Sequence, residues 1–432
     1  MAEVQGVASI GRKLSSHMRV AKSLAIVAYI LILVSISSLV HNPSDGTYEF
    51  SIYSSLPLTF WASLIASILI GFTILSVSLR YSSRTYQSLG ISIILLSNTI
   101  LLLLPIIRGY FIYGRGDVLT HIGWMNTIID TGSIQNLLYP TDHILGVIIT
   151  HVTGINTFAI TSLIPFVFSI LFIPSIFILS KLVLHSNKQV IFAVMLGSMM
   201  LFGYNYHLLF APSHQAFLLL PLLLFIFIKS YSSGFKPRFN ILLLITITSL
   251  VLFHPMNSIL FILVILCFGI ANFLLRRSEV RPNTVSDGSK AGYFRNIILI
   301  FIILYLSWQP YLFYVKSKLR NIIQSFGEDS NSSQLSNYSD IISSHDLSLG
   351  DVWDYLLLTY GVIIFLVIPV SIGIIYHLVK HRGAIGRLSP ALLAFALAFV
   401  IFLIIFVIEL VFTFVIESGR YMKYCILLSI LL

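Results

Sequence analysis

The chain has 432 residues, of which 57% are hydrophobic and only 10% are charged, and its mean hydropathy is +0.95. A soluble protein carries roughly 25% charged residues, so this composition indicates an integral membrane protein. The net charge of +10 does not indicate a nucleic-acid partner, because the basic residues cluster in short segments beside apolar runs. Cys267 and Cys425 lie inside apolar runs, which argues against a disulfide framework or a cysteine metal site.

The first predicted element is a membrane span at 23–40, which follows four basic residues, Arg12, Lys13, Arg19 and Lys22. The apolar run is about as long as a helix that crosses the ~30 Å hydrocarbon core. No small-residue cleavage site follows it, so we do not expect a removable signal peptide. We expect a first transmembrane helix whose N-terminus lies in the cytoplasm.

The remaining apolar runs predict an all-α, polytopic bundle of about twelve transmembrane helices in one membrane domain over residues 1–432. The predicted spans are 23–40, 56–79, 88–107, 156–180, 189–206, 212–228, 240–253, 257–275, 297–314, 355–376, 390–416 and 421–432. The short run at 143–153 is placed in the membrane interface. With that choice, most of the 26 basic residues fall on the cytoplasmic side, as the positive-inside rule requires. Most of the 16 acidic residues fall outside or near the outer membrane face.

Two long segments face the outside under this topology. Residues 108–154 form the first, which we expect to be a catalytic loop with interfacial helices. Residues 315–352 form the second, which is polar and which we expect to be mobile. It contains two glycosylation patterns, at Asn331 and Asn337.

The first outer loop carries the clearest chemical pattern, an aspartate and a histidine four residues apart. A helix that begins near Asp117 would place Asp117 and His121 on one face, with the carboxylate in the first turn. Asp117 is then either a helix-capping residue or a base for an acceptor hydroxyl, with His121 in support. The pair also matches two ligands of a divalent cation, but two ligands do not predict a metal site. Asp130 is expected in a closing turn, with Gly132 as the C-terminal cap.

The second helix of this loop is predicted to begin after Tyr139 and Pro140. Proline is favoured at a helix start, and either Thr141 or Asp142 would serve as the N-cap. His143 would lie at the membrane surface beside the loop, where it is a candidate contact for a phosphate.

Other polar residues are expected near the outer face or inside the spans. His207, His214 and His254 fall at outer ends of spans, where a lipid phosphate needs hydrogen-bond donors. Glu409 lies inside a predicted span, where a charge is costly. Arg420 either binds a donor phosphate through its forked donors or extends toward lipid headgroups. The candidate substrate contacts are Arg115, His121, Asp142, His143, His214 and Arg420.

With these residues, the chain resembles the GT-C class of integral membrane glycosyltransferases. The resemblance is strongest to archaeal and bacterial enzymes related to protein mannosyltransferases and aminoarabinose transferases. The resemblance lies in Asp117 in the first large outer loop, the Tyr139-Pro140 opening of the next apolar helix, and the many spans that follow. It covers most of the chain in architecture, but its specific motif covers only residues 109–154.

The resemblance implies transfer of a sugar from a polyprenyl-phosphate donor to a glycan, lipid or protein acceptor at the outer face of the plasma membrane. It also implies that Asp117 is the catalytic base and that no nucleotide sugar is needed. The chain departs from the family's oligosaccharyltransferases, because Trp353-Asp354 lacks the Trp-Trp-Asp context and we expect no soluble C-terminal domain. The first large loop also follows the third predicted span rather than the first.

Two other functions remain open from the residues. A transporter or lipid-linked oligosaccharide flippase would place ionisable residues near the membrane midplane, where Glu409 is the one candidate. A surface polysaccharide ligase or polymerase would use the same kind of lipid-linked sugar. Because the ionisable residues gather at one face, the sequence favours the enzyme over the transporter.

Overall fold

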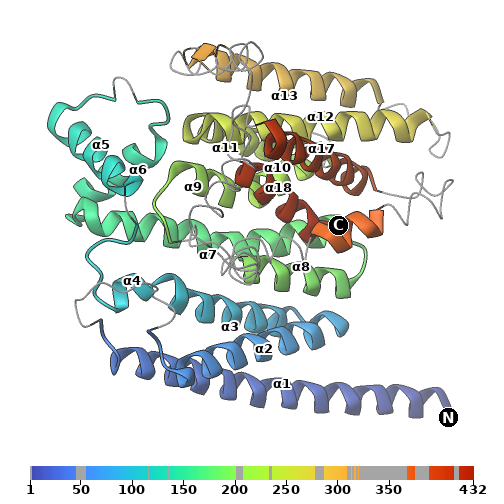
Figure 1. Ribbon diagram of the computed structural model, residues 1–432. Coiled ribbons are helices and arrows are strands. Elements are labelled where there is room, and N and C mark those ends of the chain that lie inside the picture. Colours follow the sequence, from blue (N-terminus) through green and yellow to red (C-terminus); the bar gives the residue numbers. More distant parts are fainter. Residues whose placement is uncertain are drawn as a thin grey trace. The chain divides into compact units, whose positions relative to one another are not determined.

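The computed structural model consists of helices joined by turns, and the part of the chain that it describes contains no β-strand (Figure 1). The described residues are 2–44, 55–114, 116–134, 137–200, 208–232, 236–277, 287–308, 313, 316, 317, 320, 367–374, 389–412 and 418–432. The prediction of an all-α protein is confirmed for them. The glycosylation patterns and nearly all of the predicted second outer loop lie outside the described residues.

The chain divides into two compact units. The first contains Met1–Ser133 and Asp142–Leu222, and the second contains Ile134–Thr141 and Leu223–Leu432. The helices that lie in the first unit are α1 (Ala2–Val40), α2 (Leu58–Arg80), α3 (Arg84–Leu102), α4 (Leu104–Ile107), α5 (Asp117–Thr131), α6 (Thr141–Thr153), α7 (Thr157–Val183), α8 (Asn187–Met200) and α9 (Pro212–Leu218). The later helices are α10 (Leu220–Ser232), α11 (Pro237–Phe253), α12 (Pro255–Arg277), α13 (Asp287–Ser307), α17 (Pro390–Phe412) and α18 (Ser418–Leu431). The single domain over residues 1–432 stays a prediction.

Within the described residues, five helices are long and apolar enough to cross a membrane. They are Arg19–Val40 of α1, then α2, α3 and α7, and Pro255–Leu275 of α12. The helices α9 and α10 are bent by 42° where they join, and they make a sixth candidate if the bent pair is one span. Large apolar side chains of α1, such as Leu33 and Val40, are exposed, as expected for a surface that lipid covers. These features make the chain a multi-pass membrane protein.

The first three helices lie side by side (Figure 1), and serine hydroxyl groups as well as apolar side chains lie between them. The hydroxyl oxygens of Ser35 and Ser63 lie 2.7 Å apart between α1 and α2, and those of Ser67 and Ser97 lie 2.7 Å apart between α2 and α3. Small polar side chains allow two membrane helices to approach closely and to hydrogen-bond across the interface. This explains why spans with several serines remain apolar enough to cross a membrane.

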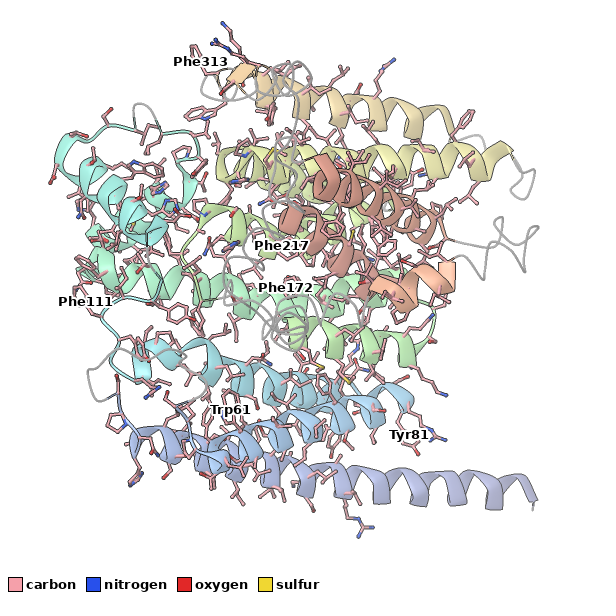
Figure 2. The ribbon with its side chains drawn as sticks, viewed as in Figure 1. Trp61, Tyr81, Phe111, Phe172, Phe217 and Phe313 are labelled. Carbon is pink, nitrogen blue, oxygen red and sulfur yellow. The ribbon has the colours of Figure 1, made fainter. Side chains whose placement is uncertain are left out.

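The long helix α7 forms the centre of the first unit and contacts α3, α5, α8 and α9. Asn156 begins it, because its side-chain oxygen accepts a hydrogen bond of 2.8 Å from the backbone nitrogen of Ala159. Its buried face carries Phe172, whose ring stacks on that of Phe217 of α9 at a centroid distance of 6.4 Å (Figure 2). The helix α7 therefore packs against α5 near its start and against α9 further along its length.

The short helix α6 agrees with the interfacial assignment of residues 143–153. It has 13 residues, and a helix of that length is about 20 Å long, which is too short for the ~30 Å core. The predicted span at 189–206 corresponds to α8, which ends at Met200, while residues 201–207 lie outside the described residues.

In the second unit, α11, α12 and α13 lie side by side, and α12 also contacts α17, which packs on α18 (Figure 1). The hydroxyl of Tyr424 on α18 donates a hydrogen bond of 2.8 Å to the side-chain oxygen of Asn257 on α12. This bond satisfies two buried polar groups among apolar side chains. Of the predicted span at 355–376, the described residues are 367–374, which are helical.

We expect Gly146→Ala to lower the free energy of unfolding by about 1–2 kcal/mol. A methyl group at Gly146 would meet the sulfur of Met125 at 2.5 Å and a methyl carbon of the stiff side chain of Ile160 at 3.2 Å. The matched control is Gly123→Ala on α5, where a methyl group meets nothing within 4 Å. The control should raise stability by about 0.5–1 kcal/mol, because alanine favours the helix. Unfolding of both variants in mixed micelles measures the difference, and equal shifts would contradict the packing of α6 on α5.

Candidate functional site

The helix α5 begins and ends where its glycines allow the chain to turn. Gly116 precedes it with a φ of 54°, and Gly132 closes it in the left-handed conformation with a φ of 65°. The predictions that a helix begins near Asp117 and that Gly132 ends it are both confirmed. Its buried residues, at spacings of three and four, form one stripe: Val118, His121, Ile122, Met125 and Ile128.

The stripe of α5 faces the first turns of α6. Pro140 directly precedes α6, and Asp142 and His143 lie in its first turn, fully buried together with Gly146. Because Gly146 has no side chain, the sulfur of Met125 can approach the backbone of α6 closely. The contact between the two helices therefore buries polar residues that the sequence placed at a membrane surface.

His121 and His143 form a direct hydrogen bond across this contact. The Nδ1 atom of His121 lies 2.9 Å from the Nε2 atom of His143, and both side chains are buried. Burial lowers the pKa of His121 to about 4, although the negative charge of Asp117 acts in the opposite direction. His121 is therefore neutral at pH 7.

Two aromatic side chains enclose the histidine pair. The ring of Trp124 lies 5.2 Å from the rings of both His121 and His143. The ring of Phe210 lies 5.7 Å from that of His121 and 6.3 Å from that of His143. Neither residue is among the contacts predicted from the sequence. The position of Trp124, three residues after His121, was a signal for it, whereas nothing in the sequence connects Phe210 to α5.

Asp142 is the most unusual group in this region. Its side chain is 0% exposed, and neither carboxyl oxygen has a hydrogen-bond partner among the described residues. An N-cap aspartate accepts hydrogen bonds from backbone nitrogens, so the prediction that Asp142 caps α6 is not supported by its contacts. Burial raises the pKa of this carboxyl well above its usual range. Asp142 is therefore a carboxyl that favours its protonated form.

Asp117 lies in a different environment from His121, although they share one turn of helix. It is the first residue of α5 and is exposed, whereas His121 is buried. Asp130, in the last turn of the same helix, is exposed as well. The structure therefore brings His121, Asp142 and His143 together and leaves Asp117 at the surface one turn away.

The other predicted contacts lie on other helices or outside the described residues. His214 is buried on α9 in the first unit, and Arg420 lies on α18 in the second unit. His254 belongs to the second unit, where its ring lies 5.4 Å from that of Tyr139. Arg115 and His207 lie outside the described residues. Glu409 lies on α17, within the predicted span.

The described residues offer no ready metal centre. Nowhere in that part of the chain are three His, Cys, Asp or Glu side chains grouped so that they could hold a metal ion. The carboxyl and imidazole groups of the cluster can bind, donate and accept protons.

The helices and this cluster define the class of protein as a multi-pass α-helical membrane protein, with a buried histidine pair and carboxyl on two helices, α5 and α6, that are not among its candidate spans. The chain matches no family model, no curated protein and no solved structure.

Proposed function

We propose that the chain is a membrane glycosyltransferase with a GT-C-like bundle of about twelve transmembrane helices. It would move a sugar from a polyprenyl-phosphate donor to an acceptor at the outer face of the plasma membrane. The observation that carries the proposal is the helix pair α5 and α6, which lies in the chain between the candidate spans α3 and α7 and carries carboxyl and imidazole groups. Loops and short helices that support such groups beside a membrane are where function concentrates.

Asp117 is the proposed general base of this reaction. It is exposed at the start of α5, so an acceptor hydroxyl can reach its carboxylate. The carboxylate takes the hydroxyl proton while the hydroxyl oxygen bonds to the anomeric carbon of the sugar. The bond between that carbon and the phosphate oxygen breaks, and polyprenyl phosphate leaves with the electron pair. Arg115 and Arg420 are the proposed donors to this phosphate, because guanidinium groups bind phosphate oxygens in pairs.

The neutral side chain of His121 suits the binding of a substrate at this site. His121 at neutral pH donates one hydrogen bond and accepts another, so it can orient a sugar hydroxyl or a phosphate without adding charge. His143, Asp142 and His214 are the other proposed contacts for the substrate. A divalent cation is compatible with this chemistry but is not required by it.

The experiment that tests the function is a transfer assay with the purified chain in liposomes. Polyprenyl phosphates that carry labelled hexoses are supplied with glycan, lipid and peptide acceptors, and label on the acceptor is measured with release of polyprenyl phosphate. We expect transfer with at least one donor and none in empty liposomes. Absence of transfer by folded protein, together with movement of a fluorescent lipid-linked oligosaccharide across the bilayer, would support the transporter instead.

A further inference from the structure

The turn between α2 and α3 and the turn between α7 and α8 lie at one end of the first unit, and side-chain hydrogen bonds connect them (Figure 1). The amide nitrogen of Asn187 donates to the backbone oxygen of Leu79 at 2.7 Å, although the two residues are 108 positions apart. The ammonium group of Lys181 donates to the side-chain oxygen of Gln87 at 3.2 Å. These bonds hold the ends of α2, α3, α7 and α8 together.

Each of these four helix ends carries an exposed basic residue. We call the set the basic end, and its members are Arg80 in the last turn of α2, Arg84 at the start of α3, Lys181 in the last turn of α7 and Lys188 in the first turn of α8. Residues 50–116 and 143–222, which include all four helices, contain no aspartate or glutamate. No carboxylate on these helices therefore neutralises the basic end.

Two members of the basic end lie where a helix favours negative charge. The first turn of a helix carries partial positive charge, and neither α3 nor α8 has an acidic residue there. Arg84 is the first residue of α3, and Lys188 is the second residue of α8. The side chains and the helix dipoles therefore both favour the binding of an anion at this end of the unit.

The surface that continues from the basic end along α8 is apolar. Lys188, Phe192 and Met199 follow one another at spacings of four and seven residues, so they lie on one face of the helix. The side chain of Phe192 is 56% exposed and that of Met199 is 53% exposed. A basic group at the end of an apolar face matches the two parts of a phospholipid, its headgroup and its acyl chains.

We propose that the basic end binds the headgroup of an anionic phospholipid, whose acyl chains lie along the apolar face of α8. The ammonium group of Lys181 has three donors, of which Gln87 takes one, so two remain for phosphate oxygens. The guanidinium groups of Arg80 and Arg84 can bind phosphate oxygens in pairs. The positive-inside rule also places basic residues beside spans, but it requires no shared site. The binding of one lipid by two hydrogen-bonded turns is the additional claim.

Native mass spectrometry of the full chain tests this site. The chain is released from mixed micelles that contain equal amounts of phosphatidylglycerol and phosphatidylcholine with identical acyl chains, so the two lipids differ in headgroup and net charge. We expect the unchanged chain to retain phosphatidylglycerol in preference to phosphatidylcholine. The double variant Arg84→Gln/Lys188→Gln should bind phosphatidylglycerol about 20-fold more weakly, because each basic residue near an anionic lipid surface strengthens binding about fivefold.

The matched control is Lys236→Gln/Arg238→Gln, which removes two exposed basic residues at the start of α11 in the second unit. It should keep the preference for phosphatidylglycerol, and so should Arg84→Lys/Lys188→Arg, which retains both charges. Equal weakening in the two neutralised variants would overturn the site, because only the general charge of the protein would then matter. Equal retention of both lipids by the unchanged chain would overturn it as well.

Circular dichroism of each variant establishes that it is folded. The charge-retaining variant changes the same two positions as Arg84→Gln/Lys188→Gln, so it separates a loss of charge from a disturbance of the helix ends. Lipid retention is measured without any sugar donor, and the basic end contains none of the residues proposed for sugar transfer. The lipid site and the proposed function can therefore fail separately.

Discussion

Asp117→Asn should lower the rate of sugar transfer by about 100-fold or more while leaving the amount of folded protein unchanged. The side chain keeps its size, but an amide cannot take the proton of the acceptor hydroxyl, and a general base typically contributes ~10²–10⁴ in rate. Because Asp117 is exposed at the first turn of α5, the substitution disturbs no buried contact. The measurement is the initial rate of labelled hexose transfer in liposomes at neutral pH.

The matched control is Asp130→Asn, which removes an exposed carboxylate from the last turn of the same helix. It alters the net charge by the same amount as Asp117→Asn, so it separates the role of one carboxylate from a general effect of charge. We expect it to transfer sugar at the unchanged rate. Equal rates for the unchanged chain and Asp117→Asn would assign the base to another residue, whereas equal losses in both variants would point to surface charge.

Asp142→Asn should make the protein more stable above about pH 6.5 relative to the unchanged chain. The raised pKa of Asp142 means that the folded state holds a proton that the unfolded state loses above pH 3.8. The stability of the unchanged chain therefore falls as pH rises above that value, by about 1.4 kcal/mol per pH unit, until the folded pKa is passed. The variant lacks this dependence.

The pH range of the measurement matters because the contribution of His121 to stability changes with pH in the opposite direction from that of Asp142. The pKa of His121 is lowered from 6.5 to about 4, so the unfolded state takes up its proton first and stability is lost as pH falls from 6.5 toward 4. Below pH 6.5 the effects of His121 and Asp142 on stability oppose each other. Above pH 6.5 only the effect of Asp142 changes stability with pH. The slope of the free energy of unfolding against pH is measured in mixed micelles between pH 6.5 and 8.5. Asp130→Asn is the control. Identical slopes for Asp142→Asn and the unchanged chain would show that Asp142 is ionised in the folded protein.

The helices were largely predictable because their signals are local. Apolar runs of sufficient length predicted α2, α3, α7 and α12 within a few residues, since the cost of placing polar groups in lipid limits what can span. The break between α9 and α10 was not predicted. It lies within one apolar run, and its signal was Pro221, the second residue of α10, because proline lacks a backbone N–H and breaks or bends a helix.

The candidate site was predictable only in part. The start of α5 at Asp117 and its end at Gly132 followed from glycine conformation and the helix dipole. The four-residue spacing of Asp117 and His121 did not reveal that one is exposed and the other buried. That difference arises because Asp117 lies at the end of the helix, where the chain turns away, whereas His121 lies within the stripe that packs on α6.

The sequence alone determined that this is a multi-pass, all-α membrane protein and that one segment between its spans is rich in ionisable side chains. Hydrophobicity, charge and turn residues act over a few positions, so they can be read along the chain. The tertiary structure decided that Asp142 is buried with no hydrogen-bond partner among the described residues, and that His121 and His143, which are 22 residues apart, share a hydrogen bond. Burial and pKa depend on which distant segments exclude water from a side chain, and that information exists only in the folded contacts.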